Sequence, residues 1–89
     1  MDAQETLVKK VLDCANRIAH TSLHLQPDGD ISLQAFGFDS LSLFAFILEL
    51  ERTVGMEFDE ALLHHEDLSS IRSTAALIAA RGQTDAQAG

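Results

Sequence analysis

One serine of the sequence stands where its hydroxyl could carry a covalently attached group. Ser40 follows Gly37, Phe38 and Asp39 and begins an apolar run that extends to Gly55. Asp39 is a good helix N-cap, because its carboxylate can accept hydrogen bonds from the free N–H groups of the first helical turn. Ser40 would then be the first helical residue, at the positive end of the helix dipole, which favours a phosphate. The sequence therefore predicts a hydroxyl held at a helix N-terminus and suited to carrying a phosphate-linked group.

A hydrolytic role for the same serine is disfavoured by its neighbours. A G-x-S-x-G nucleophile elbow needs glycine two residues before and two residues after the serine, and these positions hold Phe38 and Ser42. A chain of 89 residues also leaves little room for a buried cleft with a general base and an orienting acid. We therefore expect no catalytic residues and no enzymatic activity in the chain itself.

Metal binding is the other chemistry that the residue types raise. His20 and His24 have the i,i+4 spacing that can bind zinc on a helix, but no glutamate of a metalloprotease signature lies between them. Asp28 and Asp30 are spaced as in a calcium loop, but Leu33 stands where such a loop needs its glycine. We expect no metal site.

The charge of the chain is acidic and unevenly distributed. The net charge is −8, and residues 28–67 contain ten acidic residues and one basic residue. Nucleic-acid binding is disfavoured because the phosphates would be repelled, whereas basic protein surfaces are natural partners. Acidity that serves solubility alone is the alternative interpretation.

Length and residue usage indicate one small cytoplasmic domain. A chain of 89 residues is the size of a single domain with one modest core. The single cysteine, Cys14, excludes an internal disulfide and fits a reducing compartment. No run of 18 apolar residues could span a membrane, and the N-terminal residues lack the features of a signal peptide. We expect a cytoplasmic monomer that binds neither membrane nor nucleic acid.

The spacing of apolar residues predicts the elements that position Ser40. Apolar residues recur at helical spacing in the first part of the chain, after Asp39 and after Ser70. Residues 21–38 lack this spacing and are expected to form a long loop whose apolar residues cover the core. Gly55 and Gly82 are expected to end the second and the last helix. The predicted fold class is all-α, a small four-helix bundle of three longer helices and one short helix. The predicted helices cover about 3–20, 40–54, 64–68 and, with Ser70 as N-cap and Gly82 as stop, 71–81.

The helix that begins at Ser40 is expected to carry two apolar stripes. Its core stripe consists of Leu43, Phe46, Ile47, Leu50 and Val54. The outer stripe consists of Leu41, Phe44 and Leu48. The core stripe is sufficient for a small core, so the outer stripe is expected to be exposed to partner proteins. A core face that is simply wider is the alternative.

The segment Gly37-Phe38-Asp39-Ser40-Leu41, at mid-chain in an acidic helical domain, resembles the acyl and peptidyl carrier proteins. The resemblance covers most of the chain, from about residue 7 to residue 78. In that family the serine of this motif carries a 4′-phosphopantetheine arm, whose thiol holds an acyl or aminoacyl group as a thioester. The resemblance implies that Ser40 is the attachment residue, that Asp39 caps the helix beside it, and that the start of this helix is a docking surface.

The resemblance also implies a set of partner enzymes. A phosphopantetheinyl transferase would add the arm from coenzyme A, a loading enzyme would form the thioester, and downstream enzymes with basic docking surfaces would act on the carried group. Ser42 and Ala45 stand where fatty-acid carriers of the family keep acidic residues, which favours a stand-alone carrier of polyketide or nonribosomal-peptide type. A fatty-acid carrier is the alternative within the family, and an unmodified acidic interaction domain is the alternative outside it. Residues 1–82 would form the carrier domain and 83–89 a disordered tail.

Overall fold

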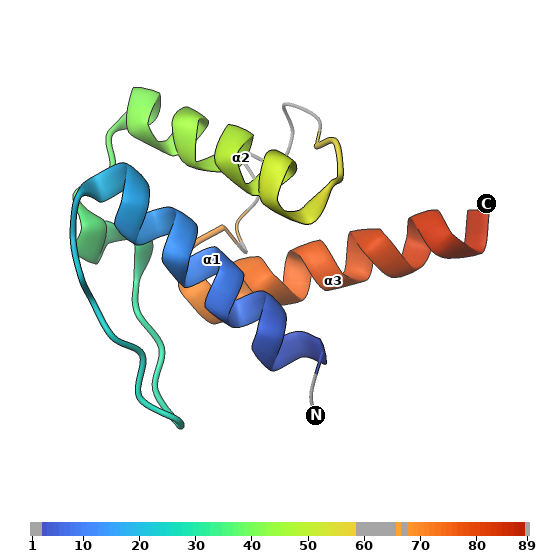
Figure 1. Ribbon diagram of the computed structural model, residues 1–89, viewed down its shortest axis with the longest axis horizontal. Coiled ribbons are helices and arrows are strands. Elements are labelled where there is room, and N and C mark those ends of the chain that lie inside the picture. Colours follow the sequence, from blue (N-terminus) through green and yellow to red (C-terminus); the bar gives the residue numbers. More distant parts are fainter. Residues whose placement is uncertain (1–2, 59–65, 67, 89) are drawn as a thin grey trace.

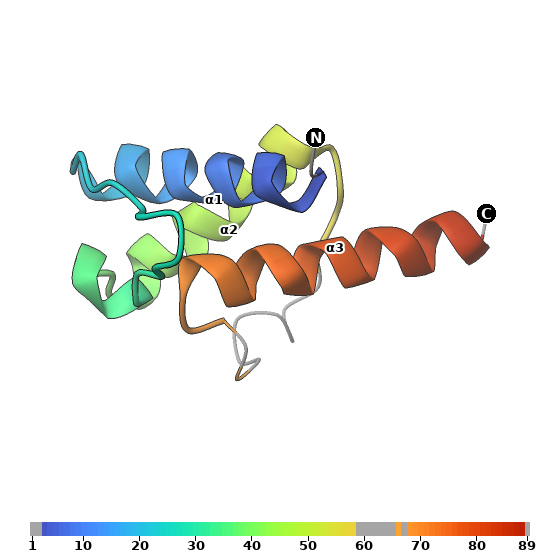
Figure 2. The same ribbon diagram turned by 90° about the horizontal axis from the view of Figure 1, so that it is seen from below.

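Three α-helices and one short 3₁₀ helix build the described part of the protein. A computed structural model describes residues 3–58, 66 and 68–88, with only the backbone described for 81–88. The elements are α1 (Ala3–Ala19), η1 (Leu33–Phe36), α2 (Ser40–Val54) and α3 (Ile71–Ala88). Helix α1 packs against both α2 and α3 and runs in the opposite direction to them (Figures 1 and 2). The C-terminus of α1 and the N-termini of α2 and α3 therefore lie at the same end of the bundle.

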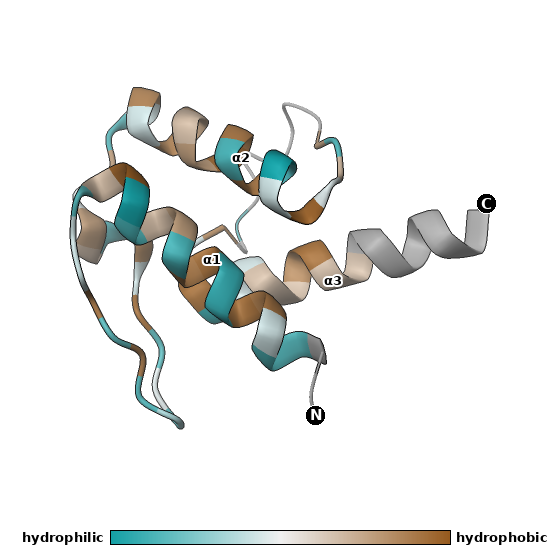
Figure 3. Cartoon of the chain, in the orientation of Figure 1, coloured by the Kyte–Doolittle hydropathy of each residue, from teal (hydrophilic) through white to brown (hydrophobic). Residues whose placement is uncertain are grey.

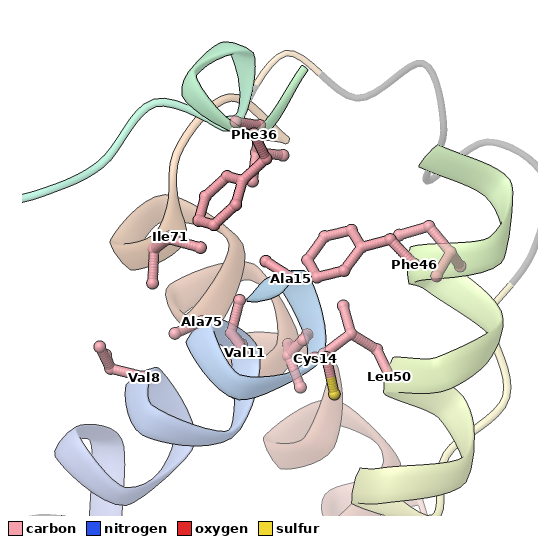
Figure 4. Packing of buried hydrophobic residues seen from close by; sticks show 12 residues of the cluster. Val8, Val11, Cys14, Ala15, Phe36, Phe46, Leu50, Ile71 and Ala75 are labelled. Carbon is pink, nitrogen blue, oxygen red and sulfur yellow. The ribbon is translucent and has the colours of Figure 1, made fainter. Parts of the chain in front are cut away.

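The core lies where the inner faces of the helices meet. Phe46 and Leu50 of α2 point toward Ala15 and Cys14 of α1, and Phe36 of η1 extends the cluster at one end (Figure 4). Burial of a side chain of this size contributes about 1.5–3 kcal/mol to the free energy of folding. The described residues form no β-strand, so the predicted all-α fold class is confirmed. The buried hydrophobic residues are Val8, Val11, Cys14, Ala15, Leu33, Phe36, Phe46, Ile47, Leu50, Ile71, Ala75 and Ile78.

Helices α1 and α2 begin and end close to the predicted positions. Helix α1 ends at Ala19, and His20 follows in a left-handed conformation with φ of 58°. Helix α2 has the predicted bounds, and Gly55 ends it with φ of 72° and an N–H that donates to the Glu51 carbonyl. The central residues of the predicted core stripe are buried, and the residues at its two ends are half-buried. Local capping and amphipathicity are therefore sufficient to locate α2.

The 3₁₀ helix η1 inside the long loop was not predicted. Leu33 and Phe36 are both buried, and their spacing of three residues places them on one face of a 3₁₀ turn. The Ser32 hydroxyl caps η1 by accepting a hydrogen bond from the Gln34 N–H at 3.2 Å. The loop residues expected to cover the core therefore do so partly through a short helix.

Helix α3 is longer than the sequence predicted. Its predicted N-cap, Ser70, directly precedes Ile71, and Ile71, Ala75 and Ile78, which recur at the helical spacing of a core face, are buried. The predicted helix end at Gly82 is wrong, because the helical backbone continues to Ala88 and projects past the other helices (Figures 1 and 2). Glycine costs only about 1 kcal/mol relative to alanine inside a helix, and alanine and glutamine after it are good helix formers. The carrier-domain boundary at residue 82 and a disordered tail over 83–89 stay predictions, and the short helix predicted over 64–68 falls mostly outside the described residues.

Candidate functional site

The predicted modification site lies at the N-terminus of α2. Asp39 is the N-cap, with an extended backbone, and its Oδ1 accepts a hydrogen bond from the Ser42 N–H at 2.7 Å. Its carbonyl oxygen accepts the first helical bond, from the Leu43 N–H at 2.9 Å. Ser40 is the first residue of α2 and is exposed. Its side chain is therefore open to solvent at the positive end of a well-capped helix.

The cap beside Ser40 carries a permanent negative charge near neutral pH. The backbone N–H of Ser42, followed by the Ser42 hydroxyl, donates hydrogen bonds that lower the pKa of Asp39. A hydrogen bond to the ionised form favours that form. The carboxylate therefore keeps its capping role over the physiological pH range.

The residues that lead into the cap have a defined conformation. Gly37 ends η1 with φ of 72° and ψ of 27°. A Cβ at this position would meet no atom within 4 Å, so the left-handed backbone alone makes glycine the favoured residue. The ring of Phe38 stacks on Phe36 at a centroid distance of 5.6 Å and on Phe46 at 5.3 Å. Ser40 therefore follows a backbone that is anchored to the core by an aromatic stack.

The outer stripe of α2 is exposed, as predicted. Leu41 is 78% exposed, Phe44 45% and Leu48 44%, and these are the exposed large hydrophobic residues of the described chain. Figure 3 shows hydrophobic residues on the outer side of α2 as well as on the side facing α1. The alternative of a wider core face is therefore wrong, and an apolar surface adjoins Ser40.

The two carboxylates of α2 already have partners within the protein. Glu49 forms an ion pair with Arg17 of α1. The Glu51 carboxylate accepts a hydrogen bond from the Phe58 N–H at 2.6 Å. The first nine residues of α2 carry no charged side chain. The dominant feature of this helix surface next to Ser40 is thus apolar area.

The sequence reasoning missed a junction between the long loop and the start of α3. The Asp30 carboxylate accepts hydrogen bonds from the Ser70 hydroxyl and the Arg72 N–H, and the Arg72 side chain donates to loop carbonyls. The available signals were an aspartate after a Pro-Asp-Gly turn and an arginine in the first turn of a helix. No local pattern pairs residues that are 42 positions apart, so these signals could not be combined.

The candidate metal ligands do not come together. Among residues 3–58, 66 and 68–88, no three His, Cys, Asp or Glu side chains form a group that could hold a metal ion. His20 and His24 do not share a helix, because α1 ends at Ala19. Within the same residues, no helix has the length and apolar character needed to cross a membrane.

Comparison with known proteins identifies a domain family. A family model described as "Phosphopantetheine attachment site" matches residues 6–78. Neither a curated protein nor a solved structure matches the chain. The matched region contains α1, the loop with η1, the whole of α2 and the first part of α3, so the capped N-terminus of α2 lies well inside it.

Proposed function

Because the chain belongs to the phosphopantetheine attachment family, we propose that Ser40 carries its 4′-phosphopantetheine arm. The family binds this arm covalently and works as a carrier, not as a catalyst. The function of the protein is to hold acyl or aminoacyl groups as thioesters on the arm and to present them to other enzymes. The observation that carries the assignment is an exposed serine at the first position of α2, next to the Asp39 cap.

The residues at this position suit a phosphate-linked group. Ser40 is exposed, so the arm can be attached without rearrangement of the core. The free N–H groups and the dipole of α2 favour the negative charge of the phosphodiester. The arm supplies the terminal thiol for thioester formation, and the protein supplies a fixed attachment point. Asp39 holds the first turn of α2 in place and adds a carboxylate beside the attachment point.

The outer stripe is the proposed docking surface for partner enzymes. Leu41, Phe44 and Leu48 adjoin the attachment point and offer exposed apolar area. Covering such side chains at an interface contributes roughly 1.5–3 kcal/mol for each one that is fully buried. The net charge of −8 would attract enzymes with basic surfaces before this contact forms. The partners are a phosphopantetheinyl transferase, a loading enzyme and downstream biosynthetic enzymes.

A pathway of polyketide or nonribosomal-peptide type fits the start of α2 better than fatty-acid synthesis. Ser42 and Ala45 occupy positions where fatty-acid carriers keep acidic residues. Both side chains are half-buried, and the Ser42 N–H is bound to the Asp39 cap. A transferase or downstream enzyme that depends on acidic residues at these two positions would find none here. We place the protein in the cytoplasm and expect it to act as a monomer.

Intact mass tests the attachment. The apo protein is incubated with coenzyme A and a broad-specificity phosphopantetheinyl transferase, and its mass should increase by one phosphopantetheine group. Ser40→Ala should remain folded by circular dichroism, because it loses only an exposed hydroxyl, and should show no mass increase. Ser42→Ala is the matched control and should be modified like the wild type.

Two outcomes would contradict the proposal. Labelling of Ser40→Ala, or loss of labelling in Ser42→Ala alone, would show that another serine is the attachment residue. A wild-type protein that stays unmodified with several transferases would favour the alternative of an acidic helical interaction domain.

A further inference from the structure

The long loop between α1 and α2 is attached to the start of α3 by a reciprocal pair of side chains, Asp30 and Arg72. Figure 2 shows the loop running past the first turn of α3. Each of the two residues satisfies the backbone of the other's segment, as the hydrogen bonds show.

Asp30 caps α3 from a distant part of the chain. Its Oδ1 accepts a hydrogen bond from the Arg72 N–H at 3.0 Å, and its Oδ2 accepts one from the Ser70 hydroxyl at 2.6 Å. The Ile31 N–H donates to the same Oδ1 at 2.8 Å. A carboxylate at the N-terminus of a helix satisfies free N–H groups and interacts favourably with the helix dipole. The loop therefore supplies part of the cap of α3.

Arg72 in turn binds the loop. Its guanidinium donates to the carbonyl oxygens of Gly29, of Pro27 at 3.0 Å and of Gln26 at 3.3 Å. It also forms an ion pair with Glu5 of α1 at 3.0 Å. Arginine suits this role because its planar group carries five donors in a fixed arrangement. The side chain is only 28% exposed, so the loop, α1 and α3 are joined at one point.

Two backbone hydrogen bonds extend this junction toward η1. The Ile71 N–H donates to the Ile31 carbonyl at 2.9 Å, and the Leu33 N–H donates to the Ser69 carbonyl at 2.9 Å. They form an isolated antiparallel bridge between Ser32 and Ser70. The next residue of the loop, Leu33, is already the first residue of η1.

The short segment between this bridge and Ser40 contains little conformational freedom. It consists of η1, the left-handed Gly37, the stacked Phe38 ring and the Asp39 cap. A displacement of the bridge would therefore be passed on to the start of α2 through these hydrogen-bonded and stacked residues. This continuity connects α3 with the attachment point through seven intervening residues.

We propose that Asp30 and Arg72 are positioning residues that hold Ser40 in the geometry required for modification. The inference rests on the proposed attachment at Ser40. The two side chains do not touch that residue; they act through the Ser32–Ser70 bridge and η1. When the pair is broken, the loop leaves α3 for part of the time, and the start of α2 is presented correctly in only a fraction of the molecules.

The expected kinetic effect follows from the size of that fraction. Apparent affinity falls in proportion to the population of the competent state, while turnover of the bound complex is unchanged. If one molecule in five is competent, the KM of the transferase for the carrier rises about fivefold and kcat stays constant.

The experiment compares Arg72→Gln and Asp30→Asn with two controls. The first control is Arg52→Gln, which removes the same charge from an exposed position in the last turn of α2. The second control is Ile78→Val, which weakens the core in α3 away from the junction. The KM and kcat of arm transfer are measured for each apo protein with coenzyme A and a broad-specificity transferase. Amide hydrogen exchange is measured in parallel.

The result expected is a higher KM, with unchanged kcat, in Arg72→Gln and Asp30→Asn only. The amides of Leu33 and Gly37, which are bonded to Ser69 and within η1, should exchange at least fivefold faster in these two variants. The Leu50 amide, in the core part of α2, should keep its wild-type rate.

Three results would overturn the inference. The first is a loss of stability in Arg72→Gln with wild-type KM and wild-type exchange in 33–37, since this would limit the pair to a structural role. The second is an equal rise of KM in Ile78→Val, since this would assign the effect to general destabilisation. The third is wild-type exchange in all variants. If the wild type accepts no arm, the proposed function fails on the mass measurement, while the exchange measurement still tests the junction.

Discussion

The starts of α2 and α3 are both capped helix N-termini, but α3 has a second cap that comes from a distant part of the chain. In α2 the capping carboxylate belongs to Asp39 and binds the N–H of Ser42, three residues later. In α3 the Ser70 hydroxyl accepts a hydrogen bond from the Ser73 N–H at 3.2 Å as a local cap, and the Asp30 carboxylate adds a remote cap by binding the N–H of Arg72, 42 residues later. The cap of α2 is thus formed within four consecutive residues, whereas the Asp30 carboxylate ties the start of α3 to the loop.

The two helix starts also differ in burial. Ser40 and Leu41 are exposed, with Leu41 at 78%, whereas Ile71 and Thr74 have no exposed surface. A self-sufficient cap lets α2 expose its first turn without loss of helix stability. The start of α3 instead depends on contacts with its surroundings. The exposed start of α2 suits presentation of an attached group, and the buried start of α3 suits a fixed position in the fold.

The largest expected effect comes from truncating an apolar residue at each helix start. Ile71→Ala should lower the free energy of unfolding by about 2–5 kcal/mol, because it leaves a cavity in the core. Phe44→Ala should lower it by less, because the side chain is 45% exposed, but should weaken arm transfer about tenfold by removing partner contact. Denaturant unfolding and transfer kinetics on both variants make the comparison. A stable Ile71→Ala together with an unfolded Phe44→Ala would reverse the assignment of the two regions.

Removal of each capping carboxylate tests whether the remote cap matters more for the fold. Asp30→Ala should lower the free energy of unfolding by about 1–2 kcal/mol, because the Arg72 N–H loses its acceptor and the loop loses its attachment to α3. Asp39→Ala should cost less, because only the first turn of α2 loses a partner. Urea titrations of both variants give the two losses. Equal losses would show that the remote cap adds nothing beyond ordinary helix capping.

A substitution at Thr74 should raise the free energy of unfolding, whereas the substitutions above lower it. The Thr74 Oγ1 is buried without a hydrogen-bond partner, so burial of the start of α3 leaves one hydroxyl unsatisfied. Thr74→Val keeps the shape and removes the unpaired polar group, and it should raise the free energy of unfolding by about 1 kcal/mol. Thr53→Val, at an exposed position of α2 where the hydroxyl is hydrogen-bonded to the Cys14 sulfur at 3.3 Å, is the control for a paired hydroxyl and should lack this gain. A destabilised Thr74→Val would reveal a partner for this hydroxyl in solution.

Lowering the pH should destabilise the start of α3, because it protonates the Asp30 carboxylate. Partial burial acts to raise the pKa of Asp30, but hydrogen bonds from the Ser70 hydroxyl and from the N–H groups of Arg72 and Ile31 lower it below its ordinary value of 3.8. The stability that the ionised group contributes is therefore present above pH 3.8 and is lost as the pH falls through the lower pKa of the folded state. The stability difference between wild type and Asp30→Asn, measured by unfolding from pH 7 downward, should shrink below about pH 4. A constant difference would show that the Asp30 charge is not what holds the junction.

The sequence alone determined the start of α2 and its two faces. The Asp39 cap, the exposed position of Ser40 and the Gly55 stop depend on interactions within a few residues, and such interactions can be read from the chain. The division of α2 into a buried stripe and an exposed outer stripe follows from helical periodicity. The resemblance to carrier proteins depended on this same local segment, and the family match agrees with it.

Only the tertiary structure decided how the loop and α3 are joined. The 3₁₀ helix η1 forms because Leu33 and Phe36 are buried by other elements, and no local signal specifies that burial. The Asp30–Arg72 pair joins residues that are 42 positions apart, so it exists only after α1, the loop and α3 have packed together. Helix α3 continues past Gly82 because a single glycine weakens a helix without ending it. The proposed attachment point is thus encoded locally, while the framework that holds it is assembled from residues distant in the chain.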